Sequence, residues 1–117
     1  MQRRYRLSRS RDFDVVYRRG RSVSTRYLTL HWFAREDDEV DRAPRLGLAV
    51  PKSTGTAVIR NRVKRQLREA WKVVVEDVPP GRDYVLVARP GLADAAAARD
   101  GAWLVEQVRE AIGRISE

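Results

Sequence analysis

The chain has 117 residues, 43% of them hydrophobic and 34% charged, and it contains no cysteine. These values fit one globular domain over residues 1–117, and they exclude a disordered chain, a disulfide scaffold and a thiolate zinc site. No apolar run is long enough to span a membrane or to form a secretory signal, so we expect a cytoplasmic protein with no membrane partner. The net charge of +8 indicates a polyanionic partner, with nucleic acid as the strongest candidate.

The first expected elements are a basic N-terminal arm and a short helix. Residues 1–9 lack hydrophobic periodicity, which predicts an arm anchored at Leu7. Ser10 is placed to cap the helix, and Gly20 lies where a left-handed residue would end it. The apolar face of this helix would consist of Phe13, Val16 and Tyr17.

Two strands are expected next. Residues 22–34 nearly alternate between polar and apolar side chains, with Leu28, Leu30 and Trp32 on one face of the strand. The other face would carry Tyr27, Thr29, His31 and Phe33. A second strand from Arg45 to Val50 would form a hairpin-like pair with the first. The acids between them are interpreted as a solvated turn rather than a metal site: Asp37, Asp38, Glu39 and Asp41.

The second half of the chain predicts a long helix, a strand and a final helix. Thr56 is a plausible N-cap for a helix that continues to about Asp77. The apolar run from Tyr84 to Ala88 is typical of a central strand. Apolar residues at helical spacing follow a break at Gly101. The fold class is therefore α+β: a small mixed sheet of about four strands packed with three helices, in the order α-β-β-β-α-β-α.

Positive charge is concentrated in two segments of the chain. Residues 1–26 hold nine Arg and two Asp, and residues 52–72 hold seven Lys or Arg and one Glu. On a helical wheel, the second segment separates into an apolar stripe and a contiguous basic face. That face consists of Asn61, Lys64, Arg65, Arg68 and Lys72. Arg60 and Arg62 project to different sides of the first turn.

A solvated surface is the ordinary interpretation of a charged helix face. Here the charges have one sign, and the first two lie at the helix N-terminus, where the helix dipole disfavours cations. Asn61 between Arg60 and Arg62 adds a hydrogen-bonding group suited to phosphate or ribose. Because Glu69 is the only acid in the segment, these features favour a nucleic-acid phosphate partner.

The segment AVIRNRVKRQLREA resembles the RNR signature of the bacterial ribonuclease P protein subunit. The resemblance extends to DFDVVYRRGRSV, to RLGLAVPKSTGTAVIRNRVKR and to DYVLVARPG, and so covers nearly the whole chain. It implies a ribosomal protein S5 domain 2-like fold whose β-α-β crossover is left-handed, although the general rule predicts a right-handed one.

The same resemblance implies a protein that assists removal of the 5′ leader from precursor tRNA. The partners would be the catalytic ribonuclease P RNA, which holds the Mg²⁺ ions, and the precursor tRNA, and no obligate protein partner is evident. Contacts with the catalytic RNA would come from Arg60, Asn61, Arg62, Lys64, Arg65 and Arg68. Contacts with the single-stranded leader would come from Phe13, Tyr17, His31, Lys52 and Arg89.

Two positions depart from the family pattern. Ser53 stands where a second Lys is frequent, so one contact would be missing or supplied by Arg45. Tyr17 and His31 stand where other members often have Phe and Tyr, although both can stack on bases. From spacing alone, Phe13 and Tyr17 are more typical of core residues, and a lone strand histidine is usually packed or solvated.

Other functional classes remain open from the residues themselves. A structural ribosomal or general RNA-binding protein would use the same basic surfaces, whereas a DNA-binding regulator is disfavoured because no helix-turn-helix pair can be placed. The sequence offers no Ser/His/Asp or Cys/His set and no Gly-rich nucleotide loop. We therefore expect no catalytic residue and no metal ligand in the protein itself.

Overall fold

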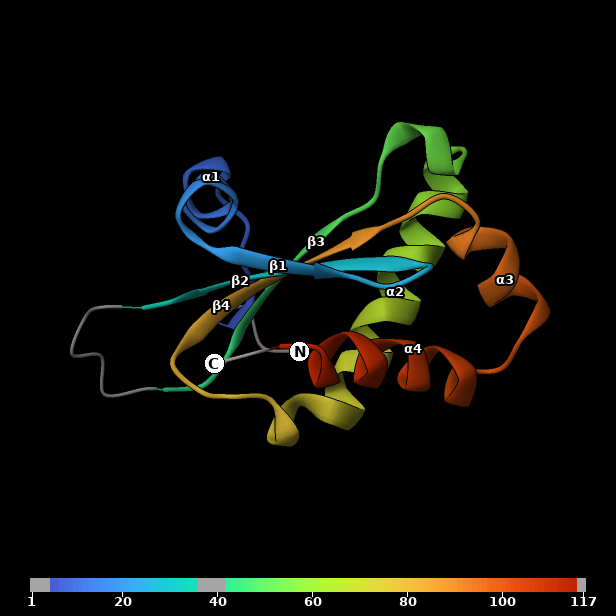
Figure 1. Cartoon of the computed structure of the whole chain (residues 1–117). Coiled ribbons are helices and arrows are strands. Elements are labelled where there is room, and N and C mark those ends of the chain that lie inside the picture. The colour runs from blue at the N-terminus through green and yellow to red at the C-terminus, as the bar shows by residue number, and fades with distance from the viewer. Residues whose placement is uncertain (1–4, 36–41, 116–117) are drawn as a thin grey trace.

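The computed structural model describes residues 5–35 and 42–115 and shows a four-stranded sheet between helices (Figure 1). The acidic run at 37–41 lies outside the described residues. The elements follow in chain order: α1 (Ser10–Arg19), β1 (Arg21–Ser24), β2 (Leu28–Ala34), β3 (Arg45–Ala49), η2 (Lys52–Thr54), α2 (Ala57–Val74), η3 (Val75–Asp77), β4 (Arg82–Ala88), α3 (Leu92–Ala98) and α4 (Gly101–Gly113). The α+β class with a mixed sheet is confirmed.

The strand order is β1-β2-β4-β3, which places β4 between β2 and β3. β2 pairs with β4 in the antiparallel direction, with Leu30 opposite Leu86, and β3 pairs with β4 in parallel, with Leu48 opposite Leu86. The predicted central position of the last strand is confirmed. The predicted hairpin between residues 22–34 and Arg45–Val50 is wrong, because β1 and β2 form the hairpin and β3 lies at the far edge.

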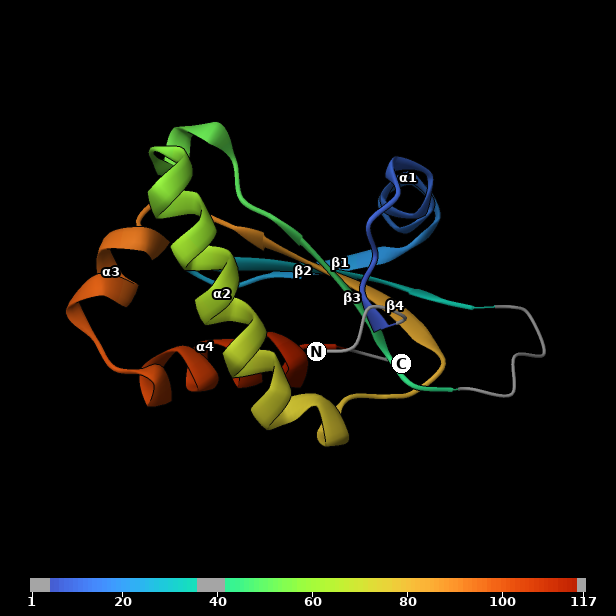
Figure 2. The same cartoon turned by 180° about the vertical axis from the view of Figure 1, so that it is seen from behind.

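The parallel pair β3 and β4 is connected through α2. The two views show α2 crossing the same sheet face as α4, while α1 covers the opposite face (Figures 1 and 2). Followed from β3 through α2 to β4, this crossover is left-handed, as the family resemblance implied. Among the described residues, no helix is long and apolar enough to cross a membrane.

The main core lies between the sheet and helices α2 and α4. Alternate residues of β2 and β4 point into it, and Leu28, Leu30, Tyr84 and Leu86 are fully buried there. The apolar stripe of α2 covers them through Val63, Leu67, Ala70, Trp71 and Val74. Burial of this stripe stabilises α2 although its other face carries many like charges, because burying each large apolar side chain contributes about 1.5–3 kcal/mol to folding.

A smaller core lies under α1 on the other face of the sheet. It joins Leu7 and Val16 to Val85 of β4, and the half-buried Phe13 packs against it. The ring of Phe13 lies over Gly47 of β3, where a Cβ atom would meet it at 2.6 Å. Gly47 therefore allows α1 to approach the sheet closely. The arm is anchored at Leu7 as predicted, and Arg6 forms an isolated bridge with Leu46.

Several predicted boundaries need correction. The cap position of α1 is Arg9, without a side-chain hydrogen bond, and Ser10 is already helical. Gly20 has φ −88°, so it is not left-handed; a Cβ there would instead collide with the carbonyl oxygens of Val16 and Trp32. Residues 22–34 form two strands because Thr25 makes a turn with Leu28. There are four α-helices among the described residues, not three, because α3 precedes α4.

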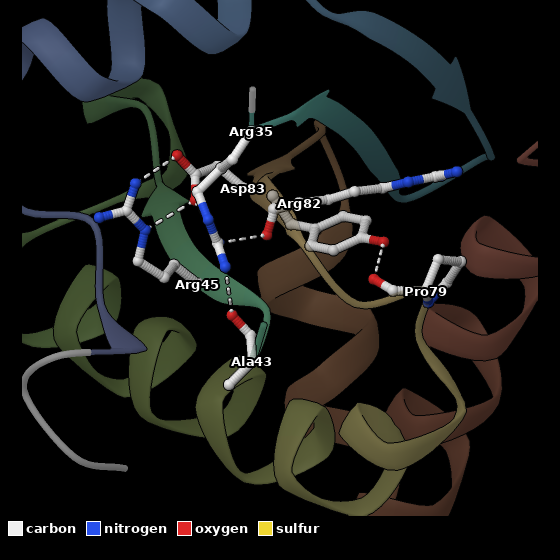
Figure 3. Close-up of polar contacts among 7 residues, drawn as sticks. Arg35, Ala43, Arg45, Pro79, Arg82 and Asp83 are labelled. Atoms are coloured by element: carbon white, nitrogen blue, oxygen red, sulfur yellow. Dashed lines mark hydrogen bonds and ion pairs between the residues drawn. The ribbon is translucent and has the colours of Figure 1, made fainter. Parts of the chain in front are cut away.

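A charged cluster closes the sheet at the end away from η2 (Figure 3). Asp83 of β4 is 6% exposed and accepts hydrogen bonds from Arg45 Nε and Nη2 at 2.7 and 2.8 Å. Arg35 Nη1 donates to the same carboxylate at 3.0 Å, and its Nη2 donates to the carbonyl of Ala43. Asp83 thus ties together the ends of three strands. Beside it, burial raises the pKa of Tyr84 to about 12, and its hydroxyl donates to the Pro79 carbonyl.

Candidate nucleic-acid interface

The basic face of α2 begins directly at a capped helix terminus. Thr56 Oγ1 accepts a hydrogen bond from the Ile59 backbone at 3.3 Å, as its predicted N-cap role requires. The side chains of Asn61 and Arg65 are exposed, whereas Lys64 and Arg68 are half-buried. These four residues lie on the face opposite the apolar stripe, so the sequence-based wheel describes this helix correctly.

The cations of this face are not neutralised within the described part of the chain. Lys72 pairs with Glu69 at 3.1 Å, but no ion pair there involves Arg60, Arg62, Lys64, Arg65 or Arg68. Arg60 and Arg62 are half-buried, and the Nε atom of each is buried without a hydrogen-bond partner in the described structure. Their stems pack against the protein while the face between them is open, which makes Asn61, Lys64, Arg65 and Arg68 its centre.

A second group of candidate residues lies between α1 and the sheet. The rings of Phe13 and Tyr17 are 6.3 Å apart, and Tyr17 meets the ring of His31 edge-on at 4.8 Å. Tyr17 is 42% exposed, so this small aromatic cluster is open to solvent on one side. Burial lowers the pKa of His31 and raises that of Tyr17, so both side chains are favoured in their uncharged forms. The cluster can therefore stack on bases without an added charge.

The floor beside this cluster is formed by alternate residues of the sheet. His31 lies opposite Val85, and the next row along the sheet pairs Thr29 with Val87 and Val87 with Ala49. Thr29, Val87 and Ala49 are each half-buried. A half-exposed strip of sheet therefore extends from the aromatic cluster towards the C-terminal ends of β3 and β4.

Lys52 and Arg89 lie at that end of the strip. β3 and β4 are parallel neighbours, so η2 with Lys52 and the residue after β4, Arg89, emerge at the same edge of the sheet (Figure 1). Lys52 is exposed. Arg89 donates from its backbone to the Tyr27 carbonyl at 3.0 Å and from its guanidinium to the Thr25 carbonyl. Of the five residues predicted to contact the leader, three thus lie in the aromatic cluster and two at the other end of this strip.

Arg45 is not in a position to replace the missing lysine at Ser53. Ser53 is exposed in η2, beyond the end of β3, whereas Arg45 begins β3. The guanidinium of Arg45 is also held by Asp83 through two hydrogen bonds. The structure therefore leaves Lys52 as the lysine of this rim.

Sequence reasoning missed one surface feature at the same end of the molecule. Tyr27 in the β1–β2 turn and Trp103 of α4 meet edge-to-face at 5.2 Å. Arg26 lies over the Tyr27 ring and Arg99 over the Trp103 ring. Each Arg is close in sequence to an aromatic residue, but that signal is too common to single out the group before the turn and α4 are known to touch.

The described part of the chain contains no group of three or more His, Cys, Asp or Glu side chains that could hold a metal ion.

The sequence matches the family model for ribonuclease P over residues 1–116, which is almost the whole chain. The chain belongs to the ribonuclease P protein family.

Known relatives agree with this assignment over most of their length. The chain is 43% identical over 114 residues to the ribonuclease P protein component of Rhodococcus opacus, covering 95% of this chain and 88% of that protein. It is 34% identical over 113 residues to the corresponding component of Geobacillus thermodenitrificans, covering 97% and 91%.

Solved structures of the family have the same fold. The ribonuclease P protein of Thermotoga maritima superposes with a TM-score of 0.83 at 28% identity, covering 96% of this chain and 98% of that one. The Staphylococcus aureus ribonuclease P protein gives 0.78 at 28% identity, with 93% of each chain covered. The chain is therefore an RNA-binding protein component of ribonuclease P that acts in tRNA processing with ribonuclease P RNA.

Proposed function

We propose that this component assists an RNA catalyst rather than cutting RNA itself. It binds the catalytic RNA through the basic face of α2, and it binds the 5′ leader of precursor tRNA through the aromatic cluster beside α1 and the half-exposed strip of sheet that ends near Lys52 and Arg89. The observation that carries the proposal is the pairing of two surfaces on one small domain: an unneutralised cationic helix face and an aromatic cluster that is open to solvent on one side. The first suits a folded phosphate backbone, and the second suits unstacked bases.

The α2 face acts as a positioning surface for the catalytic RNA. Arg65 and Asn61 are exposed and reach phosphate or ribose directly, while Lys64 and Arg68 extend the contact along the helix. Arg60 and Arg62 flank the face at the helix N-terminus, where unpaired backbone N–H groups add to their attraction for a phosphate.

The aromatic cluster and the strip of sheet beside it bind the single-stranded leader. Tyr17 and His31 offer uncharged ring surfaces for stacking, and Phe13 supports the Tyr17 ring from below. Lys52 and Arg89 supply positive charge at the rim where the strand leaves the sheet. Binding here adds leader contacts to those that the catalytic RNA makes with the tRNA body, so loss of a contact raises KM more than it lowers kcat.

Mg²⁺ belongs to the RNA in this proposal. Hard cations take clusters of oxygen ligands, and phosphate oxygens of RNA provide them. We assign the protein no step through a metal ion. Its contribution is electrostatic: cations between two polyanions lower their repulsion. We place the assembly in the cytoplasm.

The proposal is tested by mixing the purified protein with a bacterial ribonuclease P RNA and a precursor tRNA at low Mg²⁺. The protein should stimulate cleavage at the 5′ end of the mature tRNA sequence over RNA alone. Mature tRNA, which has no leader, serves as the binding control, because its affinity cannot report leader contacts. Binding of both RNAs without stimulated cleavage would instead favour a general RNA-binding protein.

A further inference from the structure

Four side chains form a continuous stack on the surface at the end of the sheet where β1 turns into β2. The order is Arg26, Tyr27, Trp103, Arg99, which we call the arginine–aromatic stack. The guanidinium carbon of Arg26 is 5.1 Å from the Tyr27 ring centroid, and that of Arg99 is 5.3 Å from the Trp103 centroid. The two rings lie edge-to-face at 5.2 Å, so the stack ends in a cation on each side.

The stack is held by a rigid frame. Trp103 lies in the first turn of α4, which Asp100 caps by accepting a hydrogen bond from the Trp103 backbone at 3.0 Å. The β1–β2 turn is fastened by Arg114 Nη1, which donates to the Ser24 carbonyl at 2.8 Å, and by Arg89 on the Thr25 carbonyl. The position of both rings is thus set by segments far apart in the sequence.

The two terminal arginines remain available to a ligand. Arg26 and Arg99 are exposed, and within the described residues neither forms an ion pair. A guanidinium stacked on a ring uses its flat face and leaves its N–H edge for hydrogen bonds. Because the stacked side chain is already restrained, binding a phosphate costs less conformational entropy than for a free arginine.

The stack lies beside the proposed leader-binding strip. Arg89, at the end of that strip, contacts Thr25 through its guanidinium and Tyr27 through its backbone. Thr25 and Tyr27 flank Arg26 in sequence. Arg26 therefore lies in the turn that Arg89 contacts, and Arg99, at the end of α3, lies on the other side of the contact between Tyr27 and Trp103.

We propose that the arginine–aromatic stack is a second leader site, in which Arg26 and Arg99 bind phosphates of the single-stranded leader where it continues past Arg89. The inference rests on the proposed function, because it extends the same leader track. It predicts that affinity continues to increase when the leader is lengthened beyond the nucleotides that reach Arg89. Contacts to phosphates also predict a site that is insensitive to leader sequence.

The test uses the reconstituted holoenzyme, wild type or carrying Arg26→Gln and Arg99→Gln together. Affinity is measured for precursors whose leader is lengthened one nucleotide at a time. The double variant should bind mature tRNA and short-leader precursors as wild type does, but lose about 3- to 10-fold in affinity for long leaders. Its slope of log K against log salt for long leaders should be smaller by about 1.4, for two phosphate contacts on a single strand.

The matched control is Arg109→Gln, which removes one exposed positive charge from α4 outside the stack. It should leave the leader-length profile unchanged. Arg26→Lys with Arg99→Lys keeps the charge but loses the planar stacking group, and should restore only part of the affinity. Thermal unfolding checks the fold, and if the double variant unfolds, Arg26→Gln alone on the exposed turn is measured in the same way.

Three results would overturn the inference. One is an unchanged leader-length profile in the double variant. Another is an equal loss for mature tRNA and long-leader precursors, and the third is weaker binding of the catalytic RNA alone, which would assign the stack to that RNA. In each case a wild-type protein that still stimulates cleavage leaves the proposed function standing, whereas no stimulation by wild type removes both.

Discussion

Asp83 holds together the strands at the end of the sheet away from η2. The Asp83 side chain is 8% exposed, and its carboxylate is shared by the side chains of Arg35, 6% exposed, and Arg45, 30% exposed. These three residues come from β4, from the residue after β2 and from the start of β3. Two guanidinium groups around one carboxylate give a network in which each partner keeps the others in place.

Replacing Asp83 with Asn should destabilise the protein by about 3 kcal/mol, because the largely buried site would lose the carboxylate that both guanidinium groups contact. Urea unfolding of the RNA-free protein measures the change. The control is Asp77→Asn, which breaks the exposed pair with Arg109 and should cost less than about 1 kcal/mol. Equal losses in the two variants would contradict a special role for Asp83.

His31 predicts a pH effect with a definite sign. Burial lowers its pKa below the ordinary value of 6.5, so the unfolded chain binds its proton more readily than the folded protein does. The stabilising contribution is therefore present above pH 6.5 and is lost as the pH falls through the lower folded pKa.

Urea unfolding of wild type and His31→Gln at a series of pH values between neutral and mildly acidic isolates this contribution. Carboxylates titrate in both proteins, so the difference between the two curves reports His31 alone. Wild type should lose more stability than the variant as the pH falls below 6.5. Parallel curves would show that His31 titrates equally in the folded and unfolded states.

Among the elements, α2 has two roles on two faces: one face packs on the sheet, and the other is available to RNA. Its buried stripe holds the helix on the sheet, while the open face carries cations that repel one another by a few tenths of a kcal/mol per neighbouring pair. The helix is stable because the stripe, rather than the surface, supplies the free energy. Substitutions on the open face should therefore change RNA binding with little effect on folding.

Arg65→Ala should weaken assembly with ribonuclease P RNA and flatten its salt dependence by about 0.7 to 0.9 in slope, for one lost phosphate contact. Its stability should stay within about 0.5 kcal/mol of wild type. Arg62→Ala should also weaken assembly, and because its stem is half-buried it should cost some stability as well.

Glu69→Gln is the control for α2, since it alters an exposed charge on the same helix without removing a cation. Its affinity for the RNA should be equal to or higher than that of wild type. Filter binding over a range of salt concentrations supplies the slopes. Identical slopes for Arg65→Ala and wild type would argue against the basic face as the RNA contact.

In the whole molecule, positive charge is concentrated in two segments of the chain. The basic segment 1–26 includes α1, and the segment 52–72 includes most of α2, which lies across the sheet from it. A domain with a net charge of +8 is destabilised by its own repulsion until a polyanion or salt screens it.

Salt should therefore act in opposite directions on folding and on binding. Raising KCl should increase the free energy of unfolding of the RNA-free protein by up to about 1 kcal/mol, the range of surface charge interactions. The same change should weaken RNA affinity steeply, because fewer counterions are released. Urea titrations and RNA titrations at matched salt concentrations compare the two. Stability that falls with salt would show that ion pairs outweigh repulsion.

Features that depend on neighbours along the chain could be predicted from the residues alone. Helical spacing identified the stripe and the basic face of α2, alternation assigned the two faces of β2, and the apolar run of β4 indicated a central strand. The RNR resemblance then predicted the family and both groups of RNA contacts. The roles of those individual residues stay predictions for the experiments above.

Strand pairing and contacts between distant side chains, in contrast, depend on packing across the whole fold. An alternating pattern shows that a strand has two faces but not which partner lies beside it, so the hairpin prediction failed and β4 took the place between β2 and β3. That strand order brings Asp83 to Arg35 and Arg45. The docking of α4 brings Trp103 to Tyr27. Both are set by packing between segments dozens of residues apart, which local periodicity does not encode.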